Sequence, residues 1–144
     1  MIIPDVNLML YAEIDAYPQH EAARTWWEDT LSGETRVGMP SVALFGFLRI
    51  ATSRRIFNEP LSLSDALARV ETWLDRSNVM FLGPGPRHLD TAIGLLRALG
   101  TGGNLTTDVQ LAAHAIENQA ELCSNDLDFG RFAGLRWVNP LATP

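Results

Sequence analysis

Apolar and polar positions follow two different periods along this chain. Short apolar runs predict strands over residues 2–5, 36–39, 79–82, 120–123 and 136–138. Between these runs, apolar residues recur every three or four positions, which is the spacing of one helix face. This spacing predicts helices over 6–14, 19–31, 41–52, from 62 onward, over 87–99 and from 107 onward. Because strands and helices alternate, the pattern predicts an α/β fold, a three-layer α/β/α sandwich with a mostly parallel sheet of roughly five strands.

Two of these elements carry predictions about burial. The run 79–82 is apolar throughout and is followed by a Gly-Pro turn, which is typical of a parallel strand buried on both faces. The helix over 87–99 has an apolar stripe that we expect to face the core, formed by Leu89, Ala92, Ile93 and Leu96.

Capping residues indicate where helices start. Ser41 is expected to cap the helix that follows it. Ser62 with Asp65, and Thr107 with Gln110, have the spacing of a capping box and predict two further starts.

The composition is that of one globular domain over residues 1–144 without a linker. Hydrophobic residues make up 47% of the chain and charged residues 19%. Cys123 is the single cysteine, so the chain forms no internal disulfide and a reducing compartment fits. Asp5 interrupts the first apolar run, which argues against a signal peptide, and the segment 42–51 is too short to span a membrane. We therefore expect a soluble, cytoplasmic protein with no membrane partner.

The net charge of −6, from 17 acidic and 11 basic residues, argues against a sequence-independent electrostatic grip on nucleic acid. It does not exclude a nuclease, because a carboxylate cluster that holds divalent cations contributes negative charge of its own, and a bound cation reverses the local field.

Carboxylates from three segments are expected to meet at one edge of the sheet. The first strand ends at Asp5, and the carboxyl ends of parallel strands form the edge where ligands bind. Only residues 118–119 separate the last long helix from the strand at 120–123, so that helix must begin at the strand's carboxyl end. Asp108, in its first turn, then lies at the same edge as Asp5, and the turn after the strand brings Asp126 and Asp128 there.

Like charges this close repel one another, and a hard divalent cation with oxygen ligands is the simplest resolution. Mg²⁺ fits, as does Mn²⁺, because the sequence has no Cys or His spacing for zinc. The histidines His20, His88 and His114 are scattered and are interpreted as surface or helix residues.

Purely structural roles are open for several of these groups. The helix dipole alone favours an acid at Asp108, Asp126 and Asp128 suit a turn, and Asn7 suits a helix cap. Asp5 is least explained in this way, because an unpaired charge at a strand end inside an apolar run is costly.

The motifs together resemble PIN-domain ribonucleases, in particular toxins of type II toxin–antitoxin pairs of the VapC kind. The resemblance covers the whole chain. It rests on D-x-N at 5–7, on T-D at 107–108 before an Ala-rich helix, on S-N-D-L-D-F at 124–129, and on the closing segment 134–140.

This resemblance implies a Mg²⁺-dependent endoribonuclease that leaves 5′-phosphate and 3′-hydroxyl ends and is inhibited by a small cognate antitoxin. It implies that Asp5, Asp108 and Asp126 are catalytic metal ligands together with Asp128. Asn7 and Ser124 would support them. A homodimer is a further expectation from the family, and the apolar candidates for antitoxin contact, which suit the core equally, are Trp26, Trp27, Phe45 and Phe47.

One position departs from the family pattern. Gly46 occupies the place where the family usually has a glutamate three residues before an arginine, here Arg49. A glycine inside a helix costs roughly 0.5–1 kcal/mol relative to alanine, so Gly46 requires a reason such as close packing or room for substrate. Without this acid, one or two metal ions are both compatible with the site. Arg49 could contact phosphate, pair with an aspartate or lie on the surface.

Two other functions stay open at this point. One is a PIN-fold module with weakened catalysis that holds RNA or an antitoxin, which Gly46 motivates. The other is a phosphatase of the haloacid-dehalogenase type, whose first strand also ends in an aspartate. It ranks low because Asn7 cannot act as the general acid that this chemistry requires.

Overall fold

A five-stranded parallel sheet forms the centre of the computed structural model, which describes residues 1–142. The strands stand in the order β3-β2-β1-β4-β5, and each neighbouring pair is parallel. Their bounds are β1 Ile2–Pro4, β2 Val37–Pro40, β3 Val79–Leu82, β4 Glu121–Cys123 and β5 Arg136–Val138. The predicted α/β class and the parallel sheet are therefore confirmed.

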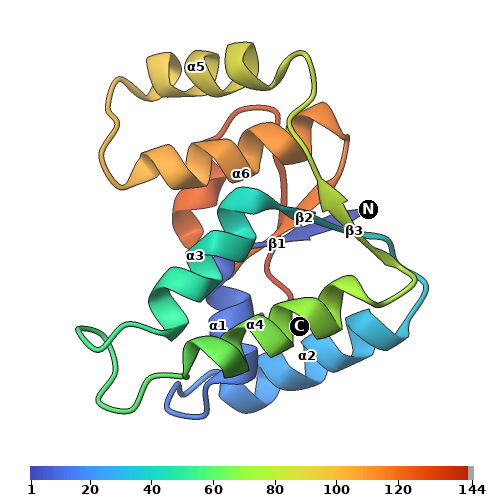
Figure 1. Ribbon diagram of the computed structural model, residues 1–144. Coiled ribbons are helices and arrows are strands. Elements are labelled where there is room, and N and C mark those ends of the chain that lie inside the picture. The colour runs from blue at the N-terminus through green and yellow to red at the C-terminus, as the bar shows by residue number, and fades with distance from the viewer. Residues whose placement is uncertain (143–144) are drawn as a thin grey trace.

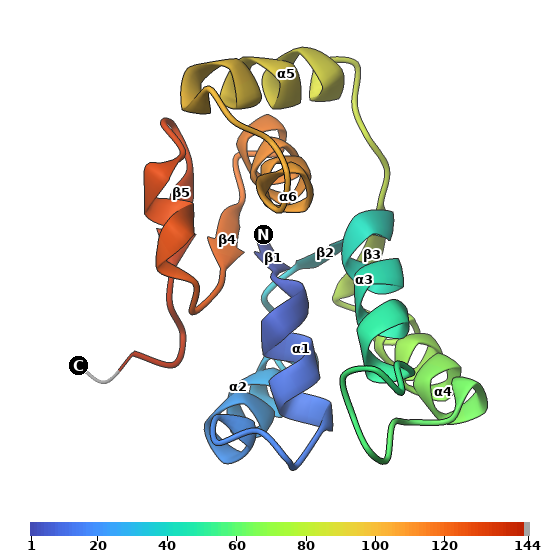
Figure 2. The same cartoon turned by 90° about the vertical axis from the view of Figure 1, so that its left-hand side faces the viewer.

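Helices cover the sheet in two layers. Their bounds are α1 Val6–Glu13, α2 His20–Ser32, α3 Ser41–Ala51, α4 Leu63–Leu74, α5 His88–Leu99 and α6 Leu105–Glu117, with a short 3₁₀ helix η1 at Leu127–Arg131. In Figure 1, α6 lies above the sheet with α5 stacked over it, while α1, α2 and α4 lie below. Figure 2 shows α3 standing beside α1, with α6 above them. Within residues 1–142, no helix is both long and apolar enough to cross a membrane.

The core is built around the central strands and a group of aromatic rings beneath them. Ile3 and Leu122, from neighbouring strands β1 and β4, are fully buried. Below the sheet, the ring of Trp73 on α4 lies edge-on to Trp27 at a centroid distance of 5.7 Å and to Phe47 at 4.8 Å. Two of the four aromatic antitoxin candidates, Trp27 and Phe47, are therefore core residues.

The expected burial of two elements is wrong. β3 lies at the edge of the sheet, so Met80 and Phe81 are exposed instead of buried on both faces. Helix α5 packs mainly on α6 and turns only Ala92 and Leu95 fully inward, which leaves Leu89 and Ile93 exposed.

One of the three predicted helix starts is confirmed. Ser62 caps α4, and its hydroxyl oxygen accepts a hydrogen bond of 3.1 Å from the amide of Asp65. Ser41 is itself the first helical residue of α3 and Pro40 takes the cap position. Helix α6 begins at Leu105, so Thr107 lies inside it and does not cap it.

Candidate metal centre and active site

Asp5 lies where β1 passes into α1, at the carboxyl edge of the sheet. Its backbone is extended, and its amide donates a hydrogen bond of 2.8 Å to the carbonyl oxygen of Cys123 on β4. The side chain is only 5% exposed, and Oδ2 accepts a hydrogen bond of 2.7 Å from the Ser124 hydroxyl. The first carboxylate is therefore buried and held by a residue 119 positions away in the chain.

Ser124 connects Asp5 to the turn that follows β4. Its hydroxyl oxygen also accepts a 3.0 Å hydrogen bond from the amide of Asp126, and Asp126 Oδ1 accepts one of 2.9 Å from the amide of Asp128. Ser124 is fully buried, and its carbonyl oxygen accepts a 2.9 Å hydrogen bond from the indole of Trp137 on β5. A continuous series of hydrogen bonds thus runs from Asp5 through Ser124 to Asp126 and Asp128.

Asp108 joins this group from the first turn of α6. Its pKa is raised to about 7, first by burial and then by the negative charges of Asp5, Asp126 and Asp128, in that order of effect. The four carboxylates therefore act on one another, as the short linker at 118–119 predicted.

The pKa of Asp5 is raised as well, from 3.8 to about 6. Burial is the main cause. The Ser124 hydrogen bond and the backbone at the start of α1 oppose it by favouring the charged form, and the charge of Asp126 raises it again. Two of the four acids thus resist ionisation in the metal-free protein, and a bound cation would relieve that resistance.

The donor set suits a hard divalent cation, because it consists of carboxylate oxygens. No three His, Cys, Asp or Glu side chains within residues 1–142 already form a group that could hold a metal ion. The acids therefore share an electrostatic field without a completed coordination shell, and side chains must move to close one. Asn7 lies in the first turn of α1 and is half-buried, and its side chain forms no hydrogen bond within the described residues.

Close packing explains Gly46. A Cβ atom at this position would lie 2.9 Å from Cγ2 of Val6, the residue that follows Asp5. The contact brings α3 against the start of α1 and leaves no room for a glutamate unless the Val6 side chain or one of the two helices shifts. Arg49 lies on α3, is exposed, and forms no ion pair within residues 1–142.

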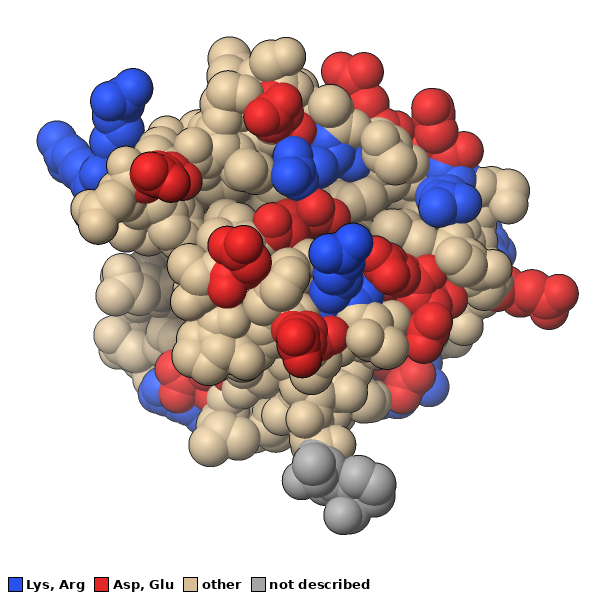
Figure 3. All heavy atoms as spheres, turned by 90° about the horizontal axis from the view of Figure 1, so that it is seen from below, with Lys and Arg blue, Asp and Glu red and all other residues tan. Residues whose placement is uncertain are grey.

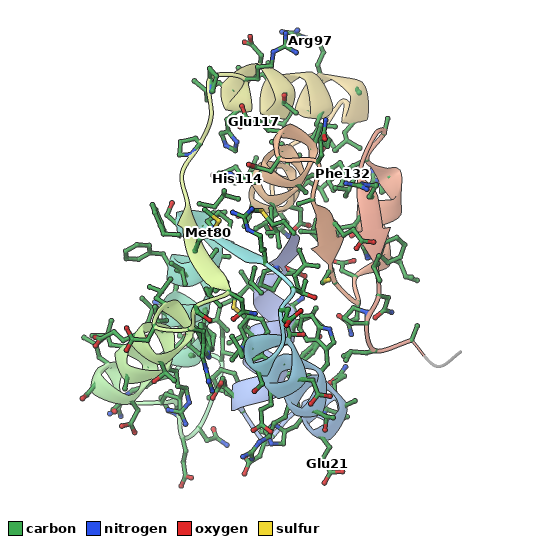
Figure 4. All side chains as sticks on the ribbon, turned by 90° about the vertical axis from the view of Figure 1, so that its right-hand side faces the viewer. Glu21, Met80, Arg97, His114, Glu117 and Phe132 are labelled. Atoms are coloured by element: carbon green, nitrogen blue, oxygen red, sulfur yellow. The ribbon has the colours of Figure 1, made fainter. Side chains whose placement is uncertain are left out.

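His114 lies away from the carboxylates and was not expected to be buried. Its side chain on α6 is 4% exposed, and its ring stands 4.2 Å from that of His88, centroid to centroid. Its pKa is lowered to about 4, first by burial and then by His88, while the charge of Glu117 opposes the shift. Figure 4 shows His114 and Glu117 on α6, with Glu117 just below α5. The helical period could have predicted this burial, because Leu111, three positions earlier on the same face of α6, is a core residue.

The carboxylate site is open to solvent on the side of Asp128, which is exposed, while Asp108 and Asp126 are half-buried and Asp5 is buried. A hollow of about 310 Å³ lies at the far end of α1, where its walls include Glu13, Arg24 and Arg69, and it contains none of the four site carboxylates. Seen from below, the molecule has acidic and basic side chains interspersed, with no large area of one sign (Figure 3). An open carboxylate site suits a polymeric substrate better than a small enclosed one.

Comparison with known proteins agrees with the fold and with the motifs. The sequence model of the PIN domain matches residues 2–135. Ribonuclease VapC33 of Mycobacterium tuberculosis is 59% identical over 141 residues, which are 98% of this chain and 99% of that protein. Ribonuclease VapC37 of the same organism is 40% identical over 142 residues, which are 99% of each chain.

Solved structures give the same fold at low identity. The crystal structure of VapBC2 from Rickettsia felis, bound to a DNA fragment from its promoter, matches with a TM-score of 0.69 and 20% identity, over 96% of this chain and 98% of the other. VapC20 of Mycobacterium tuberculosis, a toxin that cleaves the sarcin–ricin loop, matches with a TM-score of 0.68 and 14% identity, over 94% and 99%.

Proposed function

This chain belongs to the VapC ribonucleases of the PIN-domain family, and on that premise we propose that it is a metal-dependent endoribonuclease, the toxin of a toxin–antitoxin pair. Mg²⁺, or Mn²⁺ in its place, would be held by Asp5, Asp108, Asp126 and Asp128. When bound, such a cation supplies a Lewis acid that activates water and offsets charge on the scissile phosphate.

The observation that carries this proposal is the hydrogen-bonded series from Asp5 through Ser124 to Asp126 and Asp128, with Asp108 facing it from α6. Ser124 is a positioning residue here. Its hydroxyl hydrogen is donated to Asp5, and its oxygen accepts from the Asp126 amide, so a single side chain orients two acids. Fixing the acids before the substrate arrives reduces the reorganisation that the reaction requires.

The chain's other groups have distinct tasks. Asp5 is buried and fixed, whereas Asp128 lies at the exposed end of the series, where an RNA phosphate can approach. The pKa of Asp108 is raised to about 7 without a cation, so binding of a divalent cation would release a proton from this group near neutral pH. Water as the attacking group, rather than the ribose 2′-hydroxyl, gives products with 5′-phosphate and 3′-hydroxyl ends.

We propose a small antitoxin protein as the partner of this chain, since several of its fold neighbours are crystallised as VapBC complexes. A homodimer remains a prediction from the family. The buried thiol of Cys123 and the absence of a membrane-spanning helix within residues 1–142 suit action in the cytoplasm.

Cleavage of total cellular RNA by the purified protein tests the proposal. We expect Mg²⁺ to support cleavage, EDTA to stop it, and Asp108→Asn to reduce it by at least about 100-fold. Asp90→Asn is the matched control, because Asp90 occupies the first turn of α5 as Asp108 does that of α6 but lies outside the cluster. Equal activity of Asp108→Asn and Asp90→Asn would remove Asp108 from the site.

Gly46 and the incomplete coordination shell also favour a second candidate, a PIN-fold module that binds RNA or an antitoxin without cutting. Tight RNA binding with no cleavage at any Mg²⁺ or Mn²⁺ concentration would select it over the nuclease. Family membership gives no support to the phosphatase alternative.

A further inference from the structure

The outward face of α3 carries two large side chains that nothing in the described chain covers. Phe45 is 68% exposed, and Arg49 is exposed four residues later. Residues four apart lie on the same face of a helix, so the ring and the guanidinium are neighbours. Phe47, on the opposite side of the same helix, is by contrast fully buried and packs against Trp73.

This face lies beside the carboxylates. Gly46, between Phe45 and Arg49 in the chain, packs directly on Val6, which follows Asp5. Helix α3 also starts at the carboxyl end of β2, the strand next to β1, and contacts α6, which carries Asp108. Both figures of the ribbon show α3 alongside α1 (Figures 1 and 2). Phe45 and Arg49 therefore lie on the exposed face of a helix that borders the candidate active site; this face is called the rim below.

The aromatic ring and the guanidinium groups on this rim have no aromatic or acidic partner within the described residues. Phe45 has no aromatic neighbour among the described residues. Arg49 and the exposed pair Arg54 and Arg55, just past the end of α3, form no ion pair within residues 1–142. By comparison, Arg24 and Arg69 are paired with carboxylates at 2.9 and 2.8 Å. Three exposed arginines without an ion pair thus follow one another along the end of α3 and the turn after it.

We propose, on the basis of the proposed ribonuclease function, that this face of α3 binds a single-stranded stretch of the RNA substrate. Phe45 stacks on an unpaired base, Arg49 contacts a neighbouring phosphate, and Arg54 with Arg55 extends the path along the backbone. Unstacked RNA bases are recognised by aromatic rings, and guanidinium groups match phosphate geometry.

Electrostatics favour such a path. The protein carries a net charge of −6, and the four carboxylates add negative charge at the proposed site. A bound divalent cation offsets part of that charge, and arginines beside the site attract the phosphates that lie beyond the cation. Stacking adds affinity that charge repulsion does not weaken, since a base is uncharged.

The test measures binding of two fluorescent oligonucleotides in an Asp108→Asn background, in which the RNA is not cut. One probe is a short single-stranded RNA of mixed sequence, and the other is an abasic oligonucleotide of equal length with the same backbone charge. Phe45→Ala should weaken binding of the RNA by about 5- to 100-fold and leave the abasic probe unaffected. Phe45→Trp should retain binding. Phe81→Ala, at another exposed phenylalanine on the edge strand β3, is the matched control.

Arg49→Ala should weaken both probes and reduce the slope of log K against log salt by about 0.7, the loss of one phosphate contact. Arg97→Ala is its control, because Arg97 lies on the outer side of α5 (Figure 4). With the active protein, Phe45→Ala should raise KM for single-stranded RNA with little change in kcat.

Equal RNA affinities of Phe45→Ala and Phe81→Ala would overturn the proposal. So would a change in oligomeric mass or in affinity for a cognate antitoxin with RNA binding unchanged, because the face would then be a protein interface. If the wild-type protein cuts no RNA with any divalent cation, the proposed function fails, and the two binding probes still decide whether Phe45 stacks on bases.

Discussion

Replacing Asp5 by asparagine should inactivate the protein and at the same time stabilise its metal-free form. The pKa of Asp5 is raised from 3.8 to about 6 in the folded protein, mainly by burial. A carboxyl group with a raised pKa contributes stability that is fully present below 3.8 and is lost as the pH rises through about 6. Above that range, the ionised Asp5 costs roughly 3 kcal/mol relative to its neutral form.

Asparagine has nearly the shape of the neutral acid, and its side-chain oxygen can still accept the hydrogen bond from Ser124. The free energy of unfolding of Asp5→Asn should therefore exceed that of the wild type by up to roughly 3 kcal/mol near pH 8, with a melting temperature higher by roughly 10 °C. The difference should shrink as the pH falls and nearly vanish near pH 4.

Urea denaturation in EDTA, followed at several pH values, measures this difference. His114 titrates in both proteins and cancels when the two curves are subtracted. Adding Mg²⁺ near pH 8 should stabilise the wild type and leave Asp5→Asn almost unchanged, because the variant lacks the central ligand. A variant that is less stable than wild type near pH 8 without metal, or a difference that does not depend on pH, would refute the burial argument.

Three further predictions concern neighbouring groups. Gly46→Ala should destabilise the protein by about 1–3 kcal/mol despite the better helix propensity of alanine, because its Cβ would meet Val6. In a double-mutant cycle followed by urea denaturation, Val6→Ala should recover most of this loss. Ser124→Ala should weaken Mg²⁺ binding by about 10- to 100-fold in calorimetric titration, since it releases both Asp5 and the Asp126 amide, and an unchanged affinity would contradict its positioning role. The pKa of His114 is lowered to about 4, so its contribution to stability is present above pH 6.5 and is lost as the pH falls through about 4. The variant His114→Phe should therefore lose less stability over this pH range, which thermal melts measure.

The convergence of the acids could be predicted from the sequence because it depends on chain connectivity alone. A short linker, expected at 118–119 and observed at 118–120, fixes the start of α6 at the edge where β1 and β4 end, so Asp108 must approach Asp5 whatever the side-chain packing. Ser124 was placed correctly for the same reason, as the residue directly after β4.

The errors have a different origin, because they depend on strand order and on what covers a helix. An apolar run reads the same in a central strand and in an edge strand, and β3 is at the edge, which exposes Phe81. Helix α5 rests mainly on α6, so half of its apolar stripe, Leu89 and Ile93, has no partner in the described chain. The periodicity of apolar residues defines the apolar face of a helix, but it does not say how many neighbouring elements will cover that face.

The contact between Gly46 and Val6 links the carboxylate site to helix α3. Because Val6 follows Asp5, the packing that excludes a side chain at 46 also fixes the distance between α3 and the carboxylates. A glutamate at 46 would add a fifth negative charge to a group in which the pKa of Asp108 is already about 7. With glycine at 46, α3 packs directly on Val6, and the exposed face of the same helix carries Arg49 and Phe45. If the outward face of α3 binds RNA as proposed, the departure from the family pattern favours approach of a phosphate backbone to the site at the expense of a cation ligand.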